Sequence, residues 1–404
     1  MKWSAHCLAV ESVVGVVTLC EHGTLTLRDG VDRREPLIAV CRDASNLELS
    51  SLISHTVAGV IVREGSLADH FAVALYGAGI QLAVAPALEM NTLVGRYALI
   101  DGVTEIVDVV EDSAELPTQT HRADVDWGAK FEYEVDGCDA DDISLGLKAG
   151  ASGVGLLRTE WFQWNESEPP SQAAYEELYL ECAEAVGSRQ LCIRLIDVGG
   201  DKVPRWAHRE STLLQSPLGY RGIRARQLST VGSALEAQLK SIVTVARSNP
   251  IGIVIPMVTD VRDVEWVRTR LSDLGGITGS ENVRLGIMVE TPAAALGLDA
   301  LLTSGVSFVR IGPGDLSQFT LAKERRSLDP VEYSGHGLHA AVQDLVARVQ
   351  SICRMRGIQV SVCLSIDPRP ELSRELRRSG VESLCVPARA IERMARGTRS
   401  READ

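Results

Sequence analysis

Two acidic side chains in the C-terminal third of the chain stand where a catalytic metal site would need them. Glu290 ends the segment GIMVE, and Asp315 follows the segment IGPG. Each comes after a short apolar run typical of a β-strand, and the C-terminal strand ends of a (β/α)8 barrel meet at one mouth. Mg2+ prefers carboxylate oxygens together with substrate phosphate oxygens. Taken singly, Glu290 could be a solvent-facing carboxylate at a strand end, and Asp315 could be a helix N-cap. Together they predict a Mg2+ site that holds a phosphorylated substrate.

Basic residues follow other strand-like runs and would face the same mouth. Arg194 lies in the apolar run LCIRLID, which ends at Asp197, and a charge there is costly unless it is paired. The loop VGGDK that follows would bring backbone N–H groups and Lys202 to the rim, as phosphate sites often do. Arg158 follows another run, although such an arginine considered alone is most often an exposed ion-pairing residue. Arg221, in SPLGYRGIR, fits either the site or a helix surface.

Two further residues have the chemistry to transfer a proton or a phosphoryl group. Cys363 ends an apolar run; cysteine is most often a small buried residue, but a place beside a Mg2+ and arginine site favours proton transfer. His70 lies in the first turn of a helical pattern that runs from Asp69 to Ala78. A lone histidine is usually structural, yet the N–H groups of a helix N-terminus would stabilise a phosphoryl group on its imidazole.

The pattern of elements predicts two α/β domains that would position these residues. Residues 1–115 combine helical stretches with short strand-like runs and predict a small α/β domain. These runs are 36–40, 57–63, 82–85 and 97–102. Residues 116–128 are polar, contain Pro117 and predict a linker. Residues 129–404 alternate strand-like runs with amphipathic helices, as a (β/α)8 TIM barrel of typically ~250 residues requires. The eight runs are 129–135, 153–160, 190–197, 251–258, 283–290, 306–312, 358–364 and 383–388.

Composition narrows the function classes. The chain has 404 residues and 45% hydrophobic content, enough to fill large cores. A net charge of −13 with 4% aromatic residues argues against a nucleic-acid surface. The nine cysteines form no CxxC pair, which favours reduced thiols over a zinc site. No run is typical of a signal peptide or a membrane span, so we expect a cytoplasmic protein without membrane partners.

Taken together, the motifs resemble the phosphoenolpyruvate-utilising family, which includes enzyme I of the sugar phosphotransferase system, pyruvate phosphate dikinase and phosphoenolpyruvate synthase. Enzyme I is the most similar of the three. The resemblance runs from about Glu35 to Pro387. The motifs that carry it, in the family's order, are GVGLLRTEWF, IRLIDVGGDK, SPLGYRGIR, GIMVETPAAA, IGPGDLSQFTLAKER and SVC.

The resemblance implies a role for each candidate residue. Glu290 and Asp315 would hold Mg2+, Cys363 would protonate the enolate, and His70 would be the swivelling phosphohistidine. The residues implied to bind the phosphate and carboxylate of phosphoenolpyruvate are Arg158, Arg194, Arg221 and Arg325, with Lys202 and Gly314 at the same site. The family also implies a homodimer formed through the barrel.

Several positions depart from the family's pattern. Gly314 stands where the family has Asn before the metal aspartate, so one substrate hydrogen bond is missing or made by water. Leu364 and Ser365 replace the Gly-Glu that normally follows the cysteine. Asp69 places an extra negative charge beside His70, in place of the expected Thr-Ser-His. These departures bear on the stability and rate of phosphoryl transfer.

The resemblance implies that Mg2+-bound phosphoenolpyruvate phosphorylates His70, that pyruvate is released, and that the phosphoryl group passes to an unidentified acceptor, a small molecule or a protein. One alternative is an enzyme I variant that feeds a phosphocarrier protein, although the first ~115 residues leave no room for enzyme I's carrier-docking helices and no ATP-grasp domain is expected. A second is a non-catalytic phosphoenolpyruvate sensor, favoured by Gly314, Ser365 and Asp69. A third is a Mg2+-dependent lyase acting on a 2-oxo acid, in which a histidine domain would have no purpose.

Overall fold

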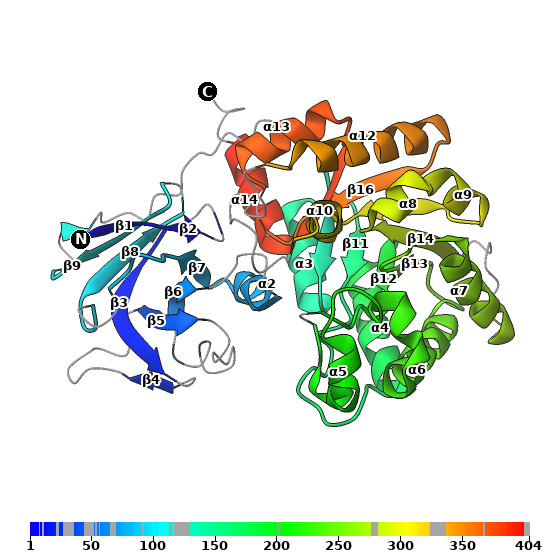
Figure 1. Cartoon of the computed structure of the whole chain (residues 1–404), viewed down its shortest axis with the longest axis horizontal. Helices are drawn as coiled ribbons and strands as arrows, with labels where there is room; N and C mark the ends of the chain where they lie inside the picture. The colour runs from blue at the N-terminus through cyan, green and yellow to red at the C-terminus, as the bar shows by residue number, and fades with distance from the viewer. Residues whose placement is uncertain are drawn as a thin grey trace.

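The computed structural model shows an N-terminal β-sheet beside a larger barrel of strands and helices (Figure 1). The described residues are 1–7, 9, 12–21, 24–26, 36–43, 52, 55, 57–64, 70–89, 93–102, 104–112, 115–116, 130–200, 202–275, 282–323, 337–366 and 368–399. Most of the predicted linker at 116–128 lies outside these ranges, and so does Arg325. No helix in these ranges is both long enough and apolar enough to cross a membrane.

The N-terminal sheet has nine strands in the order β1-β9-β8-β3-β5-β6-β7-β2, and β4 pairs with β3. The neighbours β3, β5, β6 and β7 run parallel to one another, whereas the pairs at the two edges are antiparallel. The strands are β1 Lys2–Ser4, β2 His6–Cys7, β3 Ser12–Glu21, β4 Thr24–Thr26, β5 Leu37–Asp43, β6 Val57–Glu64, β7 Gln81–Val84, β8 Tyr97–Asp101 and β9 Ile106–Val110.

Helix α2 (His70–Gly77) connects β6 to β7 and is the element on which the predicted phosphoryl carrier lies. His70 is its first residue, so a helix with His70 in its first turn is confirmed, whereas Asp69, the predicted first residue, lies outside the described residues. The strand-like runs expected near residues 36–40, 57–63, 82–85 and 97–102 are also present as β5, β6, β7 and β8. The long strand β3 was not singled out by the sequence, because its residues are apolar on both faces and show no alternation.

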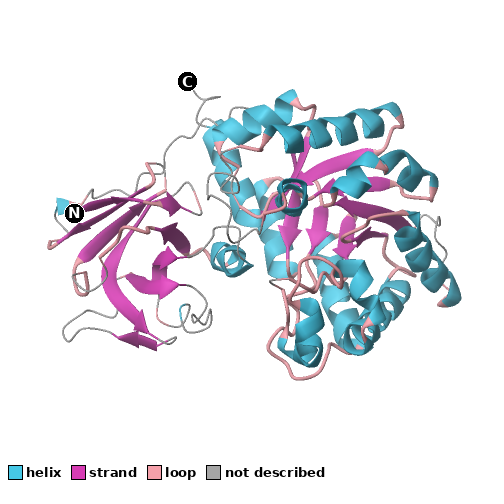
Figure 2. Cartoon of the chain, viewed as in Figure 1, coloured by secondary structure: helices cyan, strands magenta, loops and turns pink. Residues whose placement is uncertain are grey.

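The second part of the chain is a closed barrel of eight parallel strands, β10 to β17, as predicted. Figure 2 shows the strands on the inside and the helices around them. Each strand lies within one of the eight predicted runs except β10, which extends two residues further. The strands are β10 Glu132–Gly137, β11 Val154–Leu157, β12 Leu191–Arg194, β13 Ile251–Ile255, β14 Val283–Val289, β15 Phe308–Ile311, β16 Gln359–Cys363 and β17 Ser383–Pro387.

The outer ring consists of the helices that follow these strands. Asp139 and Ser171 cap the first two of them with side-chain hydrogen bonds to backbone N–H groups, as their residue types favour. The helices are α3 Ala140–Ala149, α4 Gln172–Val186, α5 Ser211–Leu214, α6 Ser229–Val245, α7 Val261–Asp273, α8 Pro292–Leu296, α9 Leu298–Thr303, α10 Pro313–Leu321, α12 Ala340–Met355, α13 Pro370–Arg378 and α14 Ala388–Arg399.

The barrel interior is filled by side chains rather than open. One inward-facing layer is Leu156, Cys192, Val254, Met288, Phe308, Cys363 and Cys385. Phe308 occupies the centre because two neighbouring strands carry glycine: a Cβ added at Gly286 would lie 2.3 Å from its Cε2, and one at Gly252 would lie 3.1 Å from its Cζ. The interior is therefore a packed core and not a pore, and the catalytic groups of this fold are expected at the C-terminal strand ends.

The N-terminal sheet and the barrel touch through arginines of the barrel. Arg369, at the N-terminal end of α13, donates to the carbonyl of Gly102 at 2.8 Å and to Oε1 of Glu105 at 2.8 Å. Arg389 donates to the carbonyl of Gly77 at 3.1 Å, at the end of α2. In Figure 1 this helix lies between the sheet and the barrel. Both arginines come from βα connections at the barrel's C-terminal face, so the sheet is docked on the side that carries the candidate site.

Candidate active site

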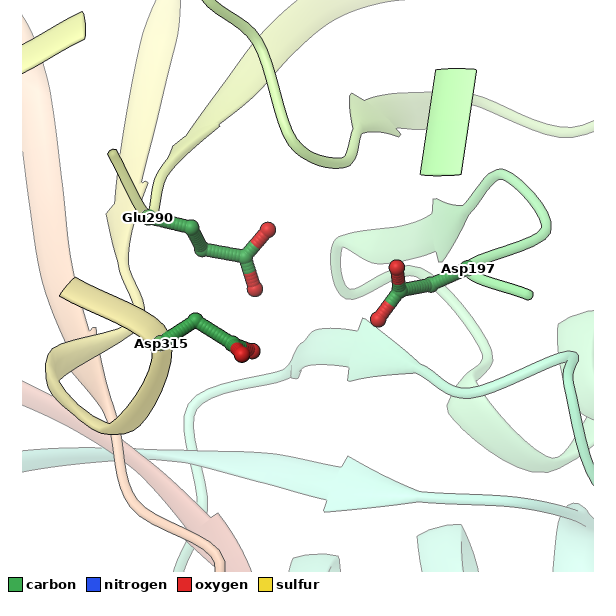
Figure 3. Close-up of side chains that lie close together, drawn as sticks. All are labelled: Asp197, Glu290 and Asp315. Carbon is green, nitrogen blue, oxygen red and sulfur yellow. The ribbon is translucent and has the colours of Figure 1, made fainter. Parts of the chain in front are cut away.

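Three carboxylates meet at the mouth of the barrel. Asp197 follows β12, Glu290 follows β14 directly, and Asp315 lies in the first turn of α10. Their oxygens lie within 4.8 Å of one another, and Figure 3 shows the three side chains pointing toward a common point. All three are at most 5% exposed. The structure therefore brings the predicted pair together and adds Asp197 to it.

The alternative readings of the predicted pair are wrong. Glu290 is buried, so it is not a solvent-facing carboxylate at a strand end. Asp315 is not the N-cap of its helix, because Gly312 holds that position. A Cβ at Gly312 would lie 2.8 Å from Cγ of Glu290, so a glycine is needed there to let the glutamate enter the mouth.

The backbone around β13 holds Glu290 in place. The N–H of Met257 donates to Oε2 of Glu290 at 3.0 Å. Met257 has a φ of 55°, a left-handed conformation that costs energy for a residue with a side chain. Gly222, with a φ of 54°, packs against it so closely that a Cβ there would lie 2.8 Å from Cβ of Met257. The loop conformation is thus maintained by tight packing, and it aims a backbone donor at the carboxylate.

Two cations bind the aspartates of this cluster. Arg221 is 1% exposed and contacts both oxygens of Asp315, Nη1 at 2.8 Å from Oδ1 and Nη2 at 2.9 Å from Oδ2. Its Nε lies 3.5 Å from Oδ1 of Asp197. Nζ of Lys202 donates to Oδ2 of Asp197 at 2.7 Å. Arg221 therefore lies in the site and not on a helix surface.

The loop after β12 was predicted to bring backbone N–H groups and Lys202 to the rim, and the structure differs from this prediction in one respect. The N–H of Gly199 donates to the carbonyl of Lys202 at 2.8 Å, and the N–H of Gly200 donates to the carbonyl of Leu214 at 2.6 Å. Both glycines have a positive φ, which a tight turn requires. These two N–H groups are already bonded within the protein, so neither glycine offers a free donor to a phosphate group. The loop contributes the ammonium group of Lys202 to the mouth.

Two further arginines are buried against carboxylates that the sequence did not single out. Arg194 pairs with Glu160 and lies 3.9 Å from Oε1 of Glu290. Arg158 pairs with Asp136 through two nitrogens and donates to Oγ of Ser365 at 3.0 Å. Arg158 is only 8% exposed, so the expectation of a surface residue is wrong.

A buried glutamine on α6 fixes the strand ends that carry these arginines. Oε1 of Gln238 accepts from the N–H of Ile196 at 3.0 Å, and its Nε2 donates to Oγ1 of Thr159 at 3.0 Å. Thr159 also donates to the carbonyl of Arg194 at 2.9 Å. The ends of β11 and β12 are thus tied to each other and to α6, which preorganises the guanidinium groups before any substrate arrives.

The charges of the mouth are unevenly balanced. It contains five buried carboxylates (Asp136, Glu160, Asp197, Glu290 and Asp315) and four buried cations (Arg158, Arg194, Lys202 and Arg221). Burial, followed by the charges of Asp197 and Asp315, raises the pKa of Glu290 to about 7. Burial opposes the ionisation of Glu160, yet Arg194 and Lys202 outweigh it and lower its pKa to about 2. Without an added cation, the mouth carries a carboxylate that resists ionisation.

The donor set fits a hard divalent cation. Opposite ligands of an octahedral Mg2+ ion lie about 4.2 Å apart, twice the usual metal–oxygen distance of about 2.1 Å. Carboxylate oxygens within 4.8 Å of one another need only a small movement to meet this requirement. Oδ1 of Asp197 is buried and accepts no hydrogen bond from any described residue, which leaves a lone pair for a metal or its water. All three ligands are carboxylates, the type that Mg2+ prefers.

The remaining candidates have different surroundings. Cys363 ends β16, and its side chain is at the edge of the packed interior with 9% exposure. Gly314 is half-buried in the first turn of α10, one residue before Asp315. The structure thus places Cys363 and Gly314 at the same face of the barrel as the carboxylates, because Gly314 follows β15 and Cys363 is the last residue of β16.

Sequence reasoning missed Asp136 and Glu160 and did not assign Asp197 to the metal cluster. Each of the three ends or follows a strand-like run, as Glu290 does. A search for every acidic residue at a predicted strand end would have found them. The pairing of each carboxylate with a particular arginine depends on the barrel closing and has no signal in the sequence.

A closed parallel barrel carries its active site at the C-terminal mouth, and the acids and arginines gathered there suit a divalent cation and an anionic substrate. The chain matches the family described as PEP-utilising enzyme, PEP-binding domain, over residues 115–402. It belongs to this family of phosphoenolpyruvate (PEP)-utilising enzymes, as the motifs indicated.

Curated relatives show which proteins the chain is similar to. It is 27% identical over 379 residues to a multiphosphoryl transfer protein of Xanthomonas campestris, covering 87% of this chain and 44% of that protein. It is 27% identical over 397 residues to a phosphoenolpyruvate-protein phosphotransferase of Haloferax volcanii, covering 88% and 69%. It is 32% identical over 262 residues to a probable phosphoenolpyruvate synthase of Methanocaldococcus jannaschii, covering 61% and 22%. The chain therefore spans only part of each relative.

Proposed function

We propose that the protein is a phosphoenolpyruvate-dependent phosphotransferase. PEP phosphorylates His70, pyruvate is released, and the phosphoryl group passes to an acceptor, which is a small molecule or a protein. The observation that carries this proposal is the buried constellation at the barrel mouth, where three carboxylates within 4.8 Å adjoin four cations. Similarity to proteins named phosphoenolpyruvate-protein phosphotransferase supports it.

The cations at the mouth would bind the substrate, whose phosphate and carboxylate groups are both anionic. Arg158, Arg194, Arg221 and Lys202 are buried there, and we assign Arg325 the same role from the family motif. Glu290 and Asp315, with Asp197 beside them, would hold Mg2+. Bound there, Mg2+ would supply the positive charge that an anionic substrate needs beside a site with more carboxylates than cations.

Each step of the reaction can be assigned to a residue. An imidazole nitrogen of His70 forms a bond to phosphorus as the bond between phosphorus and the enol oxygen breaks. The arginines stabilise the charge spread over the transferring group, and each such contact contributes about 10²–10³ in rate. The thiol of Cys363 then gives its proton to the methylene carbon of the enolate, which becomes the methyl group of pyruvate.

The carrier would move between the mouth and the acceptor. We assign residues 1–115 to the swivelling domain, 116–128 to the linker and 129–404 to the PEP-binding barrel. The start of α2 at His70 supports this assignment, because the positive end of a helix favours a bound phosphoryl group. We also propose that the protein is a cytoplasmic homodimer formed through the barrel, as the family resemblance implies.

A second candidate is a non-catalytic PEP sensor, and one observation favours it. Asp136 engages Arg158 through two nitrogens, and Ser365 accepts a third hydrogen bond from it. A guanidinium group held this firmly has less capacity left for a substrate phosphate. In a sensor the mouth would bind PEP without transferring its phosphoryl group.

The test is incubation with PEP labelled in its phosphate, with Mg2+, followed by acid or alkali treatment. We expect one label per chain that is lost in acid and survives base, as a phosphoramidate on imidazole does. His70→Ala should abolish the label, whereas the matched control His55→Ala, at an exposed histidine of the same part of the chain, should keep it. In Cys363→Ala the label should persist while pyruvate release slows about 10²-fold.

Two outcomes would contradict the proposal. If the wild-type protein binds PEP tightly but never acquires an acid-labile label, the sensor is favoured over the phosphotransferase. If His70→Ala is labelled as well as the wild-type protein, the carrier residue is a different one.

A further inference from the structure

Two cysteine thiols lie side by side at the C-terminal end of the barrel. Cys363 is the last residue of β16, Cys385 lies in β17, and the parallel register of the two strands pairs them directly. Both side chains belong to the same buried cluster inside the barrel, and Cys363 is close enough to influence the pKa of Cys385. This neighbour of the proposed proton donor has no role in the phosphoryl transfer described above.

Their spacing suits a disulfide. Neighbouring strands of a sheet lie about 4.7–4.9 Å apart, and disulfides form between Cα atoms about 4.4–6.8 Å apart. Directly paired residues of two parallel strands project to the same side of the sheet. A bond between Cys363 and Cys385 therefore needs side-chain rotation but no large movement of the barrel backbone.

The two thiols differ in access and reactivity. Cys363 is 9% exposed at the edge of the mouth, whereas Cys385 is fully buried and donates to the carbonyl of Val135 at 3.4 Å. Burial, followed by its contact with Cys363, raises the pKa of Cys385 above that of an ordinary thiol. The thiolate is the form that reacts with an oxidant, so the buried Cys385 is the less reactive of the two thiols. The first thiol to meet an oxidant is thus Cys363.

We propose that Cys363 and Cys385 form a reversible disulfide when the protein meets a peroxide, and that this disulfide switches the barrel site off. The Cys363 sulfur attacks one oxygen of hydrogen peroxide; an S–O bond forms, the O–O bond breaks, and water leaves with the Cys363 proton. The Cys385 sulfur then attacks the sulfenic acid; the S–S bond forms, the S–O bond breaks, and a second water leaves with the Cys385 proton. Two thiols are oxidised and one peroxide is reduced.

The consequence for activity rests on the proposed function. A disulfide-bonded Cys363 has no proton to give to the enolate, so release of pyruvate should slow by about 10²-fold or more. Reduction by a dithiol would restore both thiols and the activity. Phosphoryl transfer to His70 itself does not use the thiol, so labelling of His70 should be affected less than pyruvate release.

Other cysteines of the described chain offer matched controls. Cys192 belongs to the same layer, but β12 lies on the opposite side of the barrel from β16, and Gln190 donates to its sulfur at 2.8 Å. Cys353 is buried in α12, within the apolar core outside the barrel interior. Cys353→Ala therefore removes a buried thiol without touching the pair.

The experiment is peroxide treatment of the full chain, denaturation in iodoacetamide, and tryptic digestion without reductant. Trypsin places the two cysteines in separate peptides, 357–374 and 379–389, each with a single cysteine. We expect the wild-type protein and Cys353→Ala to give the two peptides as one disulfide-linked species that dithiothreitol separates. In Cys385→Ala no linked species should appear, and loss of pyruvate release should become irreversible as Cys363 proceeds to the sulfinic acid.

The outcomes separate this proposal from the proposed function. Peroxide that leaves both thiols free for iodoacetamide, or that joins Cys363 to a different cysteine, would overturn the redox pair, whether or not His70 takes the label. A linked pair in a protein that never acquires the label would support the redox pair and contradict the phosphotransferase. A linked pair with undiminished pyruvate release would show that the disulfide forms but does not act as a switch.

Discussion

The barrel mouth and the start of helix α2 are both proposed to hold the same phosphoryl group, but they are built differently. The mouth uses nine buried charged side chains from five strand ends, most of them bonded to a partner of opposite charge. The start of α2 offers the N-terminal end of a single eight-residue helix. A site that stabilises a transition state needs many fixed charges, whereas a carrier must release what it holds.

The difference extends to how each region is supported. In the mouth, Gln238 ties two strand ends together and Met257 adopts a left-handed backbone conformation to reach Glu290. Helix α2 is attached to the barrel by contacts at its far end, where Arg389 binds the carbonyl of Gly77. Strong preorganisation of one region and peripheral attachment of the other are what a fixed catalytic site and a moving carrier require.

The largest effect is expected when a charged side chain is removed from the mouth, because the mouth is proposed to depend on its fixed charges. We expect Asp315→Asn to reduce PEP-dependent labelling of His70 by about 10³-fold, because it removes a metal ligand and the partner of Arg221. Calorimetry should show that wild-type PEP binding needs a divalent cation and that the variant has lost this dependence. Asp299→Asn, at an exposed carboxylate on α9, is the control and should behave as the wild type.

One experimental result would contradict the assignment of a cation to the carboxylate cluster. If PEP binds tightly to the wild-type protein in the presence of a chelator, and Asp315→Asn binds it equally well, the carboxylate cluster does not hold a cation. Thermal unfolding of the variant, measured in parallel, separates loss of the site from loss of the fold.

A second prediction uses the titration of Glu290. Its pKa is raised from an ordinary 4.5 to about 7, so the folded protein retains a proton that the unfolded chain has released. The stability this contributes is present below pH 4.5 and is lost as the pH rises to about 7, at most about 3 kcal/mol. The lowered pKa of Glu160 acts in the opposite sense but below pH 4.5, so it does not interfere.

Urea unfolding of metal-free protein between pH 5 and pH 8 measures this effect. The wild-type free energy of unfolding should fall across that range, and Glu290→Gln should remove most of the fall. Added Mg2+ should stabilise the wild-type protein most at pH 8, because a metal ligand must be ionised. A slope that is identical in the wild type and in Glu290→Gln would contradict the assignment of the raised pKa to Glu290.

The sequence was sufficient to predict the barrel but not the ion pairs of the site. The eight barrel strands are buried on both faces, so they appear as short apolar runs between amphipathic helices, and Glu290 and Asp315 follow two of them. Asp136 and Arg158 are 22 residues apart, and Arg221 and Asp315 are 94 apart. Such partners are set by barrel closure and by loop length, neither of which has a local pattern.

The smallest expected effect concerns the attachment of the N-terminal sheet, the proposed carrier region, to the barrel. Arg369 is 6% exposed and makes three hydrogen bonds across the contact, to the carbonyls of Gly102 and Cys7 and to Oε1 of Glu105. Arg369→Ala should weaken docking by about 2 kcal/mol, a shift of roughly thirtyfold toward open arrangements. Small-angle scattering should then show a larger radius of gyration than for the wild type. Arg378→Ala, at an exposed position of the same helix, is the control and should leave the radius unchanged.

If the docked arrangement must open for His70 to deliver its phosphoryl group, Arg369→Ala should also speed transfer from labelled protein to an added acceptor by a few-fold. A variant with unchanged radius and unchanged rates would show that Arg369 does not hold the two parts together.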